Sequence, residues 1–598
     1  MIWKCPPLNL FNWNNFWKWN SMRKIILDIE TNLKHDKIWM CVTREIGGDV
    51  QVWKEASGLQ KYLDSCDLII MHNGICFDAP VLRKNWNITM KQNQMCDTLV
   101  LSRLLSPSLD GGHSLDAWGQ RLGFLKMDYK QEWIAKLTFE DNGNPNSFKR
   151  YVKYAEGDWF NKPDMPLLET YCIQDTLVTE KVYQHLTAEL TRNKFDERSI
   201  KLEHNVQAVI TKQEENGFKL NERAAVTLLA TLQNKLVILE TELQNIFPTK
   251  TTPRVSEKTG KPLKSKVEVF NPGSRKQIGE RLIEKGWKPE QFTENGQPIV
   301  DEGTLEGLDF PEAKAIAEFL LLQKRIAQIK SWLKELKPDG RVHGKVITNG
   351  AVTGRMTHHS PNMAQVPSCG SPYGEDCRDL WIVEKGYKLV GIDASGLELR
   401  MLAHYMKDDA YIYEVTQGDI HTANQKAAGL ETRAQAKTFI YAFLYGAGAA
   451  KIGKVVGAGA KEGQRLIDSF LENTPKLRAL RENVAKVCKS SGSLPGLDGR
   501  RLHVRSDHAA VNTLLQGAGA IVMKQALVIL DERLSKLGVD YKFVANVHDE
   551  WQIEVEEAYA DMVGKLGVQA IEQAGRVLEM RCPLTGEYRV GNSWKETH

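Results

Sequence analysis

The tripeptide His548-Asp549-Glu550 constrains the fold more than any other feature, because it interrupts a run of alternating apolar and polar residues at 541–555. The period of two predicts a β-hairpin with one face buried and the tripeptide at its tip. Two carboxylates at a turn without a neighbouring cation are costly unless they are solvated or hold a metal. A solvated polar turn is the alternative interpretation of this segment taken alone. The apolar positions are Phe543, Ala545, Val547, Trp551, Ile553 and Val555.

A second acidic strand end lies upstream. Residues 389–392 are apolar and predict a short buried strand that ends at Asp393, and helical spacing begins after Gly396. An aspartate at a strand end beside a hairpin tip can hold two divalent ions about 3.5–4 Å apart. Such ions activate a 3′-hydroxyl and stabilise the leaving pyrophosphate in phosphoryl transfer. We therefore predict that Asp393 and Asp549 converge.

A substrate-binding helix is predicted between these acids. Arg433, Lys437, Tyr441 and Tyr445 recur at four-residue intervals, which draws one helical stripe, cationic and then aromatic. A triphosphate beside the cations and a base stacked near the tyrosines would use all four side chains. An ordinary amphipathic helix is the alternative, but it gives the tyrosines no role. The predicted buried side is Ala436, Phe439, Ile440, Phe443 and Leu444, with Gly446 and Gly448 ending the helix.

The segments DASGLELR, RAQAKTFIYAFLYGAG and HDE resemble the three polymerase motifs of the DNA polymerase I family (family A), in the family's order. The longer segments NGAVTGRMTHHSPNMAQVP, SPYGEDCR, GDIHT and FLENTP resemble the replicative polymerases of short-tailed bacteriophages. The resemblance extends from about Arg23 to the C-terminus.

The resemblance implies the roles of the metal and nucleotide ligands. Asp393 and Asp549 would ligate two Mg²⁺ ions, with the carbonyl of Ala394 as a further ligand. Arg433, Lys437 and His421 would hold the incoming triphosphate. Tyr441 would pack against the nucleotide, and a tyrosine there goes with acceptance of dideoxynucleotides. Tyr445 would shape the template-base pocket, and Glu398 would reject ribonucleotides sterically.

The resemblance also implies DNA contacts. Arg355 and Gln516, with Asn512, would probe the minor-groove edge near the primer terminus, and His548 would bind DNA beside them. Minor-groove acceptors are shared by all Watson–Crick pairs, so this contact would check the shape of a pair rather than its sequence.

The N-terminal third carries a second set of acids. Residues 25–27 predict a strand that ends in Asp28 and Glu30, on one strand face because they are two positions apart. A later strand precedes Asp78, and Tyr171 and Asp175 are four apart on a predicted helix. Each motif alone is more typical of a turn.

Together these residues resemble the acidic quartet and tyrosine of the DEDD-type 3′–5′ exonucleases, whose carboxylates hold two metal ions while the tyrosine orients water. The resemblance implies a competent proofreading site with two Mg²⁺ ions, and Asp97 is assigned to structure.

Composition sets limits. A net charge of +4 is no signal of nucleic-acid binding, although acidic metal sites can offset basic DNA-tracking faces. The ten cysteines include no Cys-x-x-Cys pair, so no zinc site or disulfide framework is indicated. No apolar run approaches the roughly 18 residues that span a membrane. We expect a monomer that acts in the cytoplasm of an infected bacterial host.

The predicted organisation combines α/β and α+β domains. Residues 1–22 are interpreted as a disordered or mis-started extension, because Met22 directly precedes the first strand. A ribonuclease-H-like 3′–5′ exonuclease domain is expected at 23–195 and a right-hand polymerase at 196–598. Within the polymerase we expect the thumb at about 196–340, the palm at about 341–405 and 525–598, and the fingers at about 406–524.

Between two long helical patterns of the thumb lies a polar segment, 248–267, rich in proline and lysine and predicted to be mobile. In phage relatives that recruit thioredoxin, a much longer insertion occupies the corresponding place. We therefore predict that thioredoxin is not a partner, or binds only weakly, and that this basic segment touches DNA phosphates directly.

The remaining partners implied are primer-template DNA, deoxynucleoside triphosphates, a phage helicase-primase and a single-strand-binding protein. Two other functions are alternatives. A repair or gap-filling polymerase of bacterial type would need a 5′-nuclease domain, and a non-catalytic DNA-binding protein could have lost the acids, which are all present here.

Overall fold

The computed structural model describes residues 22–140, 155–255 and 258–598, so the predicted N-terminal extension lies almost wholly outside the described residues. Contacts divide the chain into two compact units. The first comprises Met1–Glu215, Val346–His358 and Val390–Arg589, and the second comprises Asn216–Lys345, His359–Leu389 and Val590–His598. The functional boundaries expected above stay predictions, because these units are defined by contacts alone.

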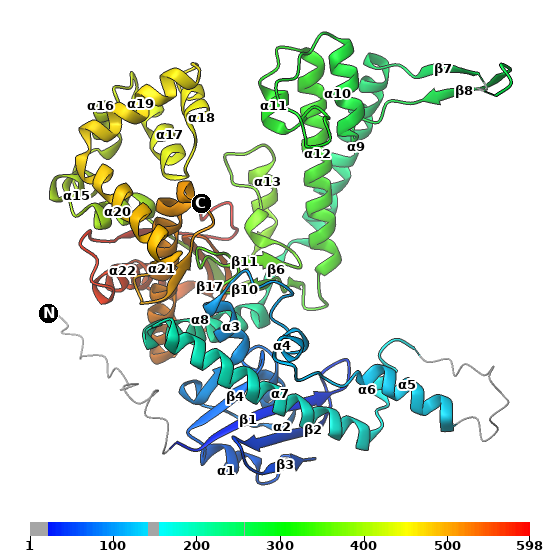
Figure 1. The fold of residues 1–598 in the computed structure, drawn as a ribbon, viewed down its shortest axis with the longest axis vertical. Helices are drawn as coiled ribbons and strands as arrows, with labels where there is room; N and C mark the ends of the chain where they lie inside the picture. The colour runs from blue at the N-terminus through cyan, green and yellow to red at the C-terminus, as the bar shows by residue number, and fades with distance from the viewer. Residues whose placement is uncertain (1–21, 141–154, 256–257) are drawn as a thin grey trace. The chain divides into compact units, whose positions relative to one another are not determined.

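The N-terminal part of the first unit is built on a five-stranded sheet with the order β3-β2-β1-β4-β5 (Figure 1). β1 pairs antiparallel with β2 and parallel with β4, and β4 pairs parallel with β5. The predicted strand at 25–27 is confirmed, and it continues through Asp28 and Glu30. The strands are β1 (Lys24–Thr31), β2 (Ile38–Glu45), β3 (Val50–Trp53), β4 (Leu68–Met71) and β5 (Met95–Asp97).

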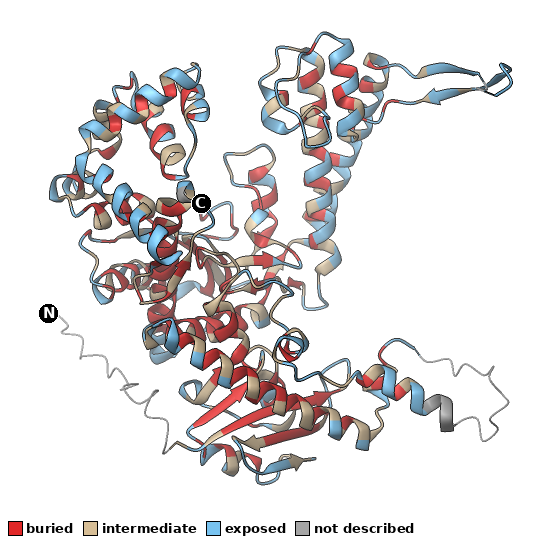
Figure 2. Ribbon diagram, viewed as in Figure 1, coloured by how far each residue is buried: buried red, intermediate tan, exposed pale blue. Residues whose placement is uncertain are grey.

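Helices pack on this sheet because β1, β2 and β4 are largely buried on both faces, as Figure 2 shows. The longest, α7, begins directly after Asp164, whose carboxylate accepts a hydrogen bond from the amide of Leu167 as the N-cap. Its buried side contributes Val178, Val182 and Leu186 to the core. The helices are α1 (Leu59–Asp64), α2 (Asp78–Trp86), α3 (Thr98–Leu105), α4 (Leu115–Leu122), α5 (Tyr129–Glu140), α6 (Asp158–Asn161) and α7 (Met165–Arg192).

A four-stranded sheet with the order β16-β17-β13-β18 forms the second part of the first unit. The predicted hairpin is confirmed, but the prediction that only one of its faces is buried was wrong. Gln552 and Glu554 are fully buried, because Gln552 bonds Glu550 and Glu554 pairs with Lys542, so side-chain partners replace water. The strands are β13 (Tyr387–Ala394), β16 (Tyr541–Val547), β17 (Glu550–Glu556) and β18 (Gly586–Gly591).

Helices fill the sequence between β13 and β16, together with the small β14–β15 hairpin. The predicted helix from Arg433 is confirmed as α17, although Phe443 is only partly buried and Gly448 begins α18 rather than ending α17. The remaining elements are α8 (Glu197–Asn216), β10 (Lys345–Ile347), β11 (Thr357–His359), α14 (Leu397–Met406), α15 (Asp409–Thr416), α16 (Ile420–Ala428), α17 (Arg433–Leu444), α18 (Ala449–Lys454), α19 (Ala460–Asn473), α20 (Pro475–Ser491), β14 (Ser493–Pro495), β15 (Arg501–His503), α21 (Ala510–Leu537) and α22 (Ala560–Val577).

Helix α21 is long and apolar enough to cross a membrane by length and composition, which corrects the expectation that no segment qualifies. However, 89% of its most apolar window is buried inside the protein. That burial is typical of the central helix of a folded core, and Ile521, Val522 and Leu527 all lie in one cluster with strands β13 and β17.

The second unit contains the two long helices predicted around the polar segment, α9 and α12. The polar segment, predicted to be mobile, forms an antiparallel hairpin, β7–β8, that projects from the helices in Figure 1. The elements are β6 (Phe218–Leu220), α9 (Glu222–Ile246), β7 (Lys250–Val255), β8 (Pro262–Glu268), α10 (Arg275–Glu284), α11 (Glu302–Glu306), α12 (Pro311–Glu335), β9 (Arg341–Val342), α13 (Gly374–Asp379) and β12 (Trp381–Ile382).

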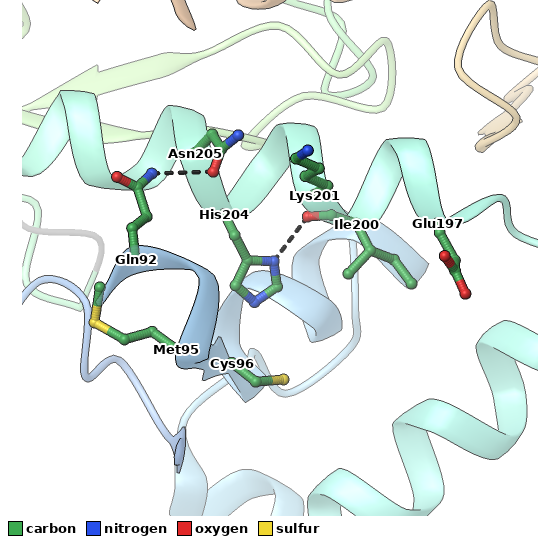
Figure 3. A pocket seen from close by; sticks show the side chains of 8 residues that line it. All are labelled: Gln92, Met95, Cys96, Glu197, Ile200, Lys201, His204 and Asn205. Carbon is green, nitrogen blue, oxygen red and sulfur yellow. Dashed lines mark hydrogen bonds between the residues drawn. The ribbon is translucent and has the colours of Figure 1, made fainter. Parts of the chain in front are cut away.

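Helix α8 joins the two sheets of the first unit. Its Ile200 packs into the core beneath the five-stranded sheet, whereas Val206 and Ile210 belong to the core beneath the four-stranded sheet. His204 accepts a hydrogen bond from the amide of Asp97 at 2.9 Å. Its other ring nitrogen bonds the carbonyl of Ile200 at 2.8 Å, as Figure 3 shows. The cavity beside it offers about 20 Å³, which is space for one water molecule rather than a ligand.

A buried ionic cluster fixes α8 to α21. Glu203 lies 2.6 Å from both Lys524 and Arg500, and Arg500 lies 2.6 Å from Asp498. All four side chains are at most 2% exposed. Two carboxylates therefore neutralise two cations in a region without water, and removing one partner would leave a buried charge uncompensated.

We predict that Glu203→Gln lowers the free energy of unfolding by about 3–5 kcal/mol, because Lys524 and Arg500 then share only Asp498. The measurement is urea unfolding followed by tryptophan fluorescence. Glu215→Gln on the same helix is the control, since its exposed pair with Arg83 at 3.0 Å should contribute less than about 1 kcal/mol. Equal losses in the two variants would contradict the prediction.

Candidate functional site

The two predicted aspartates lie on neighbouring strands. β13 and β17 are adjacent in the four-stranded sheet, and the amide of Ala394 donates a hydrogen bond to the carbonyl oxygen of Asp549 at 3.1 Å. Asp393 is the penultimate residue of β13, and Asp549 stands directly before β17, after His548 with a left-handed φ of 58°. The predicted proximity is confirmed, and the metal-binding role stays a prediction.

The electrostatics of this strand edge are those of crowded carboxylates. Partial burial, followed by the charges of Asp549, Glu550 and Glu587, raises the pKa of Asp393 to about 7. Burial also raises the pKa of Asp549, although the Arg355 guanidinium opposes that rise. The site therefore favours either protons or a cation over bare ionised carboxylates.

Glu398 lies at the centre of the neighbouring contacts. It follows β13 on the first turn of α14 and accepts hydrogen bonds from the Tyr445 hydroxyl at 2.5 Å and from Arg355 at 3.2 Å. Tyr445 caps the C-terminal end of α17, and burial and Glu398 raise its pKa. Arg355, Glu398 and Tyr445 therefore form one bonded group beside Asp549.

The cations of α17 lie at the other end of the helix. Arg433 is exposed, and its Nε lies 2.7 Å from Asp419, which also caps the N-terminus of α16. Lys437 is exposed, and no contact in the described part of the chain joins Arg433 or Lys437 to the two aspartates. Tyr441 lies between the two groups, with its ring centroid 6.4 Å from that of His421.

The predicted DNA-contacting residues lie on α21 and around the hairpin tip. Asn512 and Gln516 are partly exposed and four positions apart on α21, so they share a face. About two turns further on, Lys524 lines a small cavity with Arg355 and His548. The structure thus brings Arg355 and His548 together around this cavity. Asn512 and Gln516 lie nearer the N-terminus of α21 than Lys524 does.

The second set of acids gathers at the five-stranded sheet. Asp28 and Glu30 are on β1, and the carboxylate of Asp78 accepts a hydrogen bond from the amide of Ile29 at 3.2 Å. Burial and then the charge of Asp175 raise the pKa of Asp28 to about 7, and burial followed by Asp28 raises the pKa values of both Glu30 and Asp78. The sheet edge brings all four acids within electrostatic range of one another.

Asp97 is confirmed as a structural residue. It is 1% exposed, and its carboxylate accepts hydrogen bonds from the amides of Asn73 at 2.8 Å, Ile75 at 3.1 Å and Leu99 at 2.9 Å. Because both oxygens are occupied by backbone donors, they fix the chain after β4 and the start of α3.

Two side chains of this second site were not identified from sequence. The Lys126 ammonium lies 2.6 Å from Asp175 and 3.1 Å from the hydroxyl of Tyr171. The Cys172 thiol lies 3.3 Å from an Asp28 oxygen, and its sulfur and the oxygens of Asp28 and Glu30 lie within 4.8 Å of one another. Cys172 follows Tyr171 in the sequence, but only the orientation of α7 brings its side chain to β1.

The donor set fits a hard divalent cation. Asp175 is 4% exposed, and its Oδ1 atom has no hydrogen-bond partner among the described residues. An orphaned buried carboxylate oxygen beside three further carboxylates is suited to Mg²⁺ or Mn²⁺, which prefer oxygen ligands. Asp393 and Asp549 present the same type of donors at the other sheet.

Comparisons with known proteins agree with the polymerase half of this description. Residues 247–596 match DNA polymerase family A. The chain is 35% identical to the DNA-directed DNA polymerase of Enterobacteria phage T3, over 90% of this chain and 94% of that one. It is 34% identical to the DNA-directed DNA polymerase of Escherichia phage T7, over 96% of this chain and all of that one.

A solved structure with a similar fold is the POL domain of Pol1 from M. smegmatis, in complex with DNA primer-template and dNTP. The TM-score is 0.77 at 18% identity, over 99% of each chain, so this likeness concerns the fold alone.

The chain belongs to DNA polymerase family A. It is a DNA-directed DNA polymerase similar to those of phages T3 and T7, and its mixed α/β multidomain structure matches the polymerase fold of the family. The matched residues begin at 247, so the acids of the five-stranded sheet lie outside the family match.

We predict that the metal-free protein loses stability as the pH rises, because the folded-state pKa values of Asp28 and Asp393 are about 7 against an ordinary 3.8. Between those values the folded state holds protons that the unfolded chain has released, so raising the pH favours unfolding. In EDTA, Asp28→Asn should therefore raise the thermal midpoint more at about pH 8 than at about pH 5.

Mg²⁺ is the internal control for this measurement. It should stabilise the parent more at the higher pH, because fewer protons compete for the carboxylates. A gain for Asp28→Asn that is equal at both pH values would contradict the prediction.

Proposed function

We propose that this polymerase replicates a phage genome and carries its own 3′–5′ proofreading exonuclease, each centre using two-metal phosphoryl transfer. The observation that carries the polymerase centre is the 3.1 Å hydrogen bond between Ala394 and Asp549, which holds two strand-end carboxylates side by side. The order β3-β2-β1-β4-β5, with acids on β1, supports a ribonuclease-H-like exonuclease domain.

Two Mg²⁺ ions held by Asp393, Asp549 and the Ala394 carbonyl would lower the pKa of the primer 3′-hydroxyl and stabilise the leaving pyrophosphate. The raised pKa values of the two carboxylates support this assignment, because burial is the main cause of both rises and a bound cation offsets the cost of burying ionised carboxylates. The protein's contribution is to fix both carboxylates on paired strands.

The incoming nucleotide is held from α17. Arg433 and Lys437 bind the triphosphate, with His421 beside them, and Tyr441 packs against the nucleotide. Asp419 now neutralises Arg433 at 2.7 Å, so the triphosphate must replace that carboxylate as the partner of Arg433. Movement of α17 toward the aspartates would then exclude water before the reaction.

Selection for the sugar depends on the group around Glu398. Its carboxylate is held by Tyr445 and Arg355, so it cannot swing away from an added 2′-hydroxyl without breaking those two hydrogen bonds. Arg355, Asn512 and Gln516 inspect the minor-groove edge of the new pair, and His548 contacts DNA near the primer terminus.

In the exonuclease, two Mg²⁺ ions held by Asp28, Glu30, Asp78 and Asp175 would activate water and stabilise the leaving 3′-oxygen. Tyr171 is four positions before Asp175 on α7 and orients the attacking water. The burial of Glu30, Asp78 and Asp175 keeps bulk water from screening their charges.

The substrates of this proposal are primer-template DNA and deoxynucleoside triphosphates. A phage helicase-primase and a single-strand-binding protein are the expected replication partners, and the cytoplasm of an infected bacterium is the expected location. Thioredoxin is not expected to take part.

Substitutions should separate the two activities. Asp393→Asn is expected to reduce single-nucleotide extension by at least about 10³-fold while single-stranded DNA is still shortened, because only one metal site is damaged. Asp28→Ala with Glu30→Ala should do the reverse. Both are measured with a labelled primer in Mg²⁺. Loss of both activities in either variant would contradict the division into two centres.

The β7–β8 hairpin should bind DNA directly. Arg254, Lys261 and Lys264 are exposed, with no ion pair among the residues the structure describes, and Figure 2 shows the hairpin exposed along its length. Changing all three to glutamate should remove about two to three phosphate contacts, which lowers the slope of log affinity against log salt concentration. The same change should shorten primer-extension products. Thioredoxin should leave product length unchanged. Longer products on its addition would contradict this prediction.

A further inference from the structure

The segment that carries Lys126 is clamped beside the proposed exonuclease centre. It follows α4, and the side chain of Gln174 holds the backbone on both sides of the lysine. Gln174 accepts a hydrogen bond from the amide of Met127 at 2.9 Å and donates one to the carbonyl of Leu125 at 2.8 Å. Because Gln174 immediately precedes Asp175 on α7, this clamp sets the position of Lys126 relative to the acids.

The side chain of Lys126 bridges two of the proposed active-site groups. Its Nζ atom lies 2.6 Å from Oδ2 of Asp175 and 3.1 Å from the hydroxyl of Tyr171, and the side chain is only 15% exposed. Tyr171 and Asp175 are one helical turn apart, so a single ammonium group can bond both. The ammonium also lies 4.9 Å from the centroid of the Tyr171 ring.

The charge of Lys126 reaches further into the acidic cluster. Burial and mutual repulsion raise the pKa values of Asp28 and Glu30, and Lys126 partly opposes both shifts. Oδ1 of Asp175 has no hydrogen-bond partner in the described chain, so Lys126 occupies one oxygen of this carboxylate and leaves the other available.

We propose that Lys126 is a positioning residue of the exonuclease centre, which fixes the Tyr171 hydroxyl and the Asp175 carboxylate relative to each other. The inference rests on the excision activity proposed above. A tyrosine phenol on its own can rotate about two side-chain bonds, and a partner at its oxygen selects one orientation. The same ammonium repels a divalent cation, so Lys126 improves orientation at some cost in metal affinity.

Lys126→Met separates this role from a structural one, because methionine keeps the length of the side chain without its charge. We expect the kcat for shortening single-stranded DNA to fall about 10–100-fold with KM within about twofold, and synthesis to be unchanged. Mn²⁺ should bind the exonuclease centre at least as tightly as in the parent, measured by electron paramagnetic resonance in an Asp393→Asn background.

Three further variants complete the test. Lys126→Arg should recover part of the excision rate, since a guanidinium can also bond both oxygens. Gln174→Met should slow excision, because it releases the clamp without touching the ammonium. Lys130→Met is the matched control, as this partly exposed lysine pairs with Glu156 at 3.2 Å and should leave excision unchanged.

Two results would overturn the inference. One is an excision rate in Lys126→Met equal to that of the parent. The other is a joint loss of excision and Mn²⁺ affinity, which would mean that Lys126 only supports the fold of the site. A parent protein that fails to shorten single-stranded DNA would instead refute the proposed exonuclease itself.

Discussion

The pairing of β13 with β17 is the contact on which the polymerase centre depends. It places Asp393 beside Asp549 although the helices from α14 to α21 lie between them in sequence. The two carboxylates repel each other, and the pKa of Asp393 is raised first by burial and then by the charge of Asp549. The sheet tolerates the repulsion because its energy comes from apolar burial around Ile392, Trp551 and Ile553, so the fold can hold an arrangement that is unfavourable until a cation binds.

In the exonuclease region, repulsion between neighbouring carboxylates is reduced by a lysine of the protein itself. Four acids raise one another's pKa values at the edge of the five-stranded sheet, and Lys126 lies against Asp175. Its neutralising charge is local, because burial keeps water from screening the pair. In the polymerase region Arg355 has a similar position, since it lies between Glu398 and Asp549. Each centre thus pairs a surplus of carboxylates with one nearby cation.

The sequence predicts the fold and the candidate site correctly where a periodic pattern coincides with acids at the end of a strand. The hairpin at 541–555, the strand at Asp28 and the helix from Arg433 follow from local patterns, and so does the proximity of Asp393 and Asp549. Burial of Gln552 and Glu554 could not be predicted, because it depends on partners such as Lys542. The β7–β8 hairpin was missed because Pro253 and six basic residues at 250–266 are typical of a loop, whereas a register shift after Thr252 accommodates the proline. Lys126 could not be predicted from a periodic pattern, because its position depends on hydrogen bonds between Gln174 and the backbone on both sides of it.

The double membership of α8 has a consequence for dividing the molecule. One side of the helix completes the core under the five-stranded sheet through Ile200, and the other completes the core under the four-stranded sheet through Val206. A fragment that starts at residue 196 would therefore uncover an apolar surface and leave His204 without its partner at Asp97. Truncation would destabilise the remaining polymerase fragment. The proposed exonuclease activity is therefore better removed by substitution within the intact chain than by deletion of the N-terminal residues.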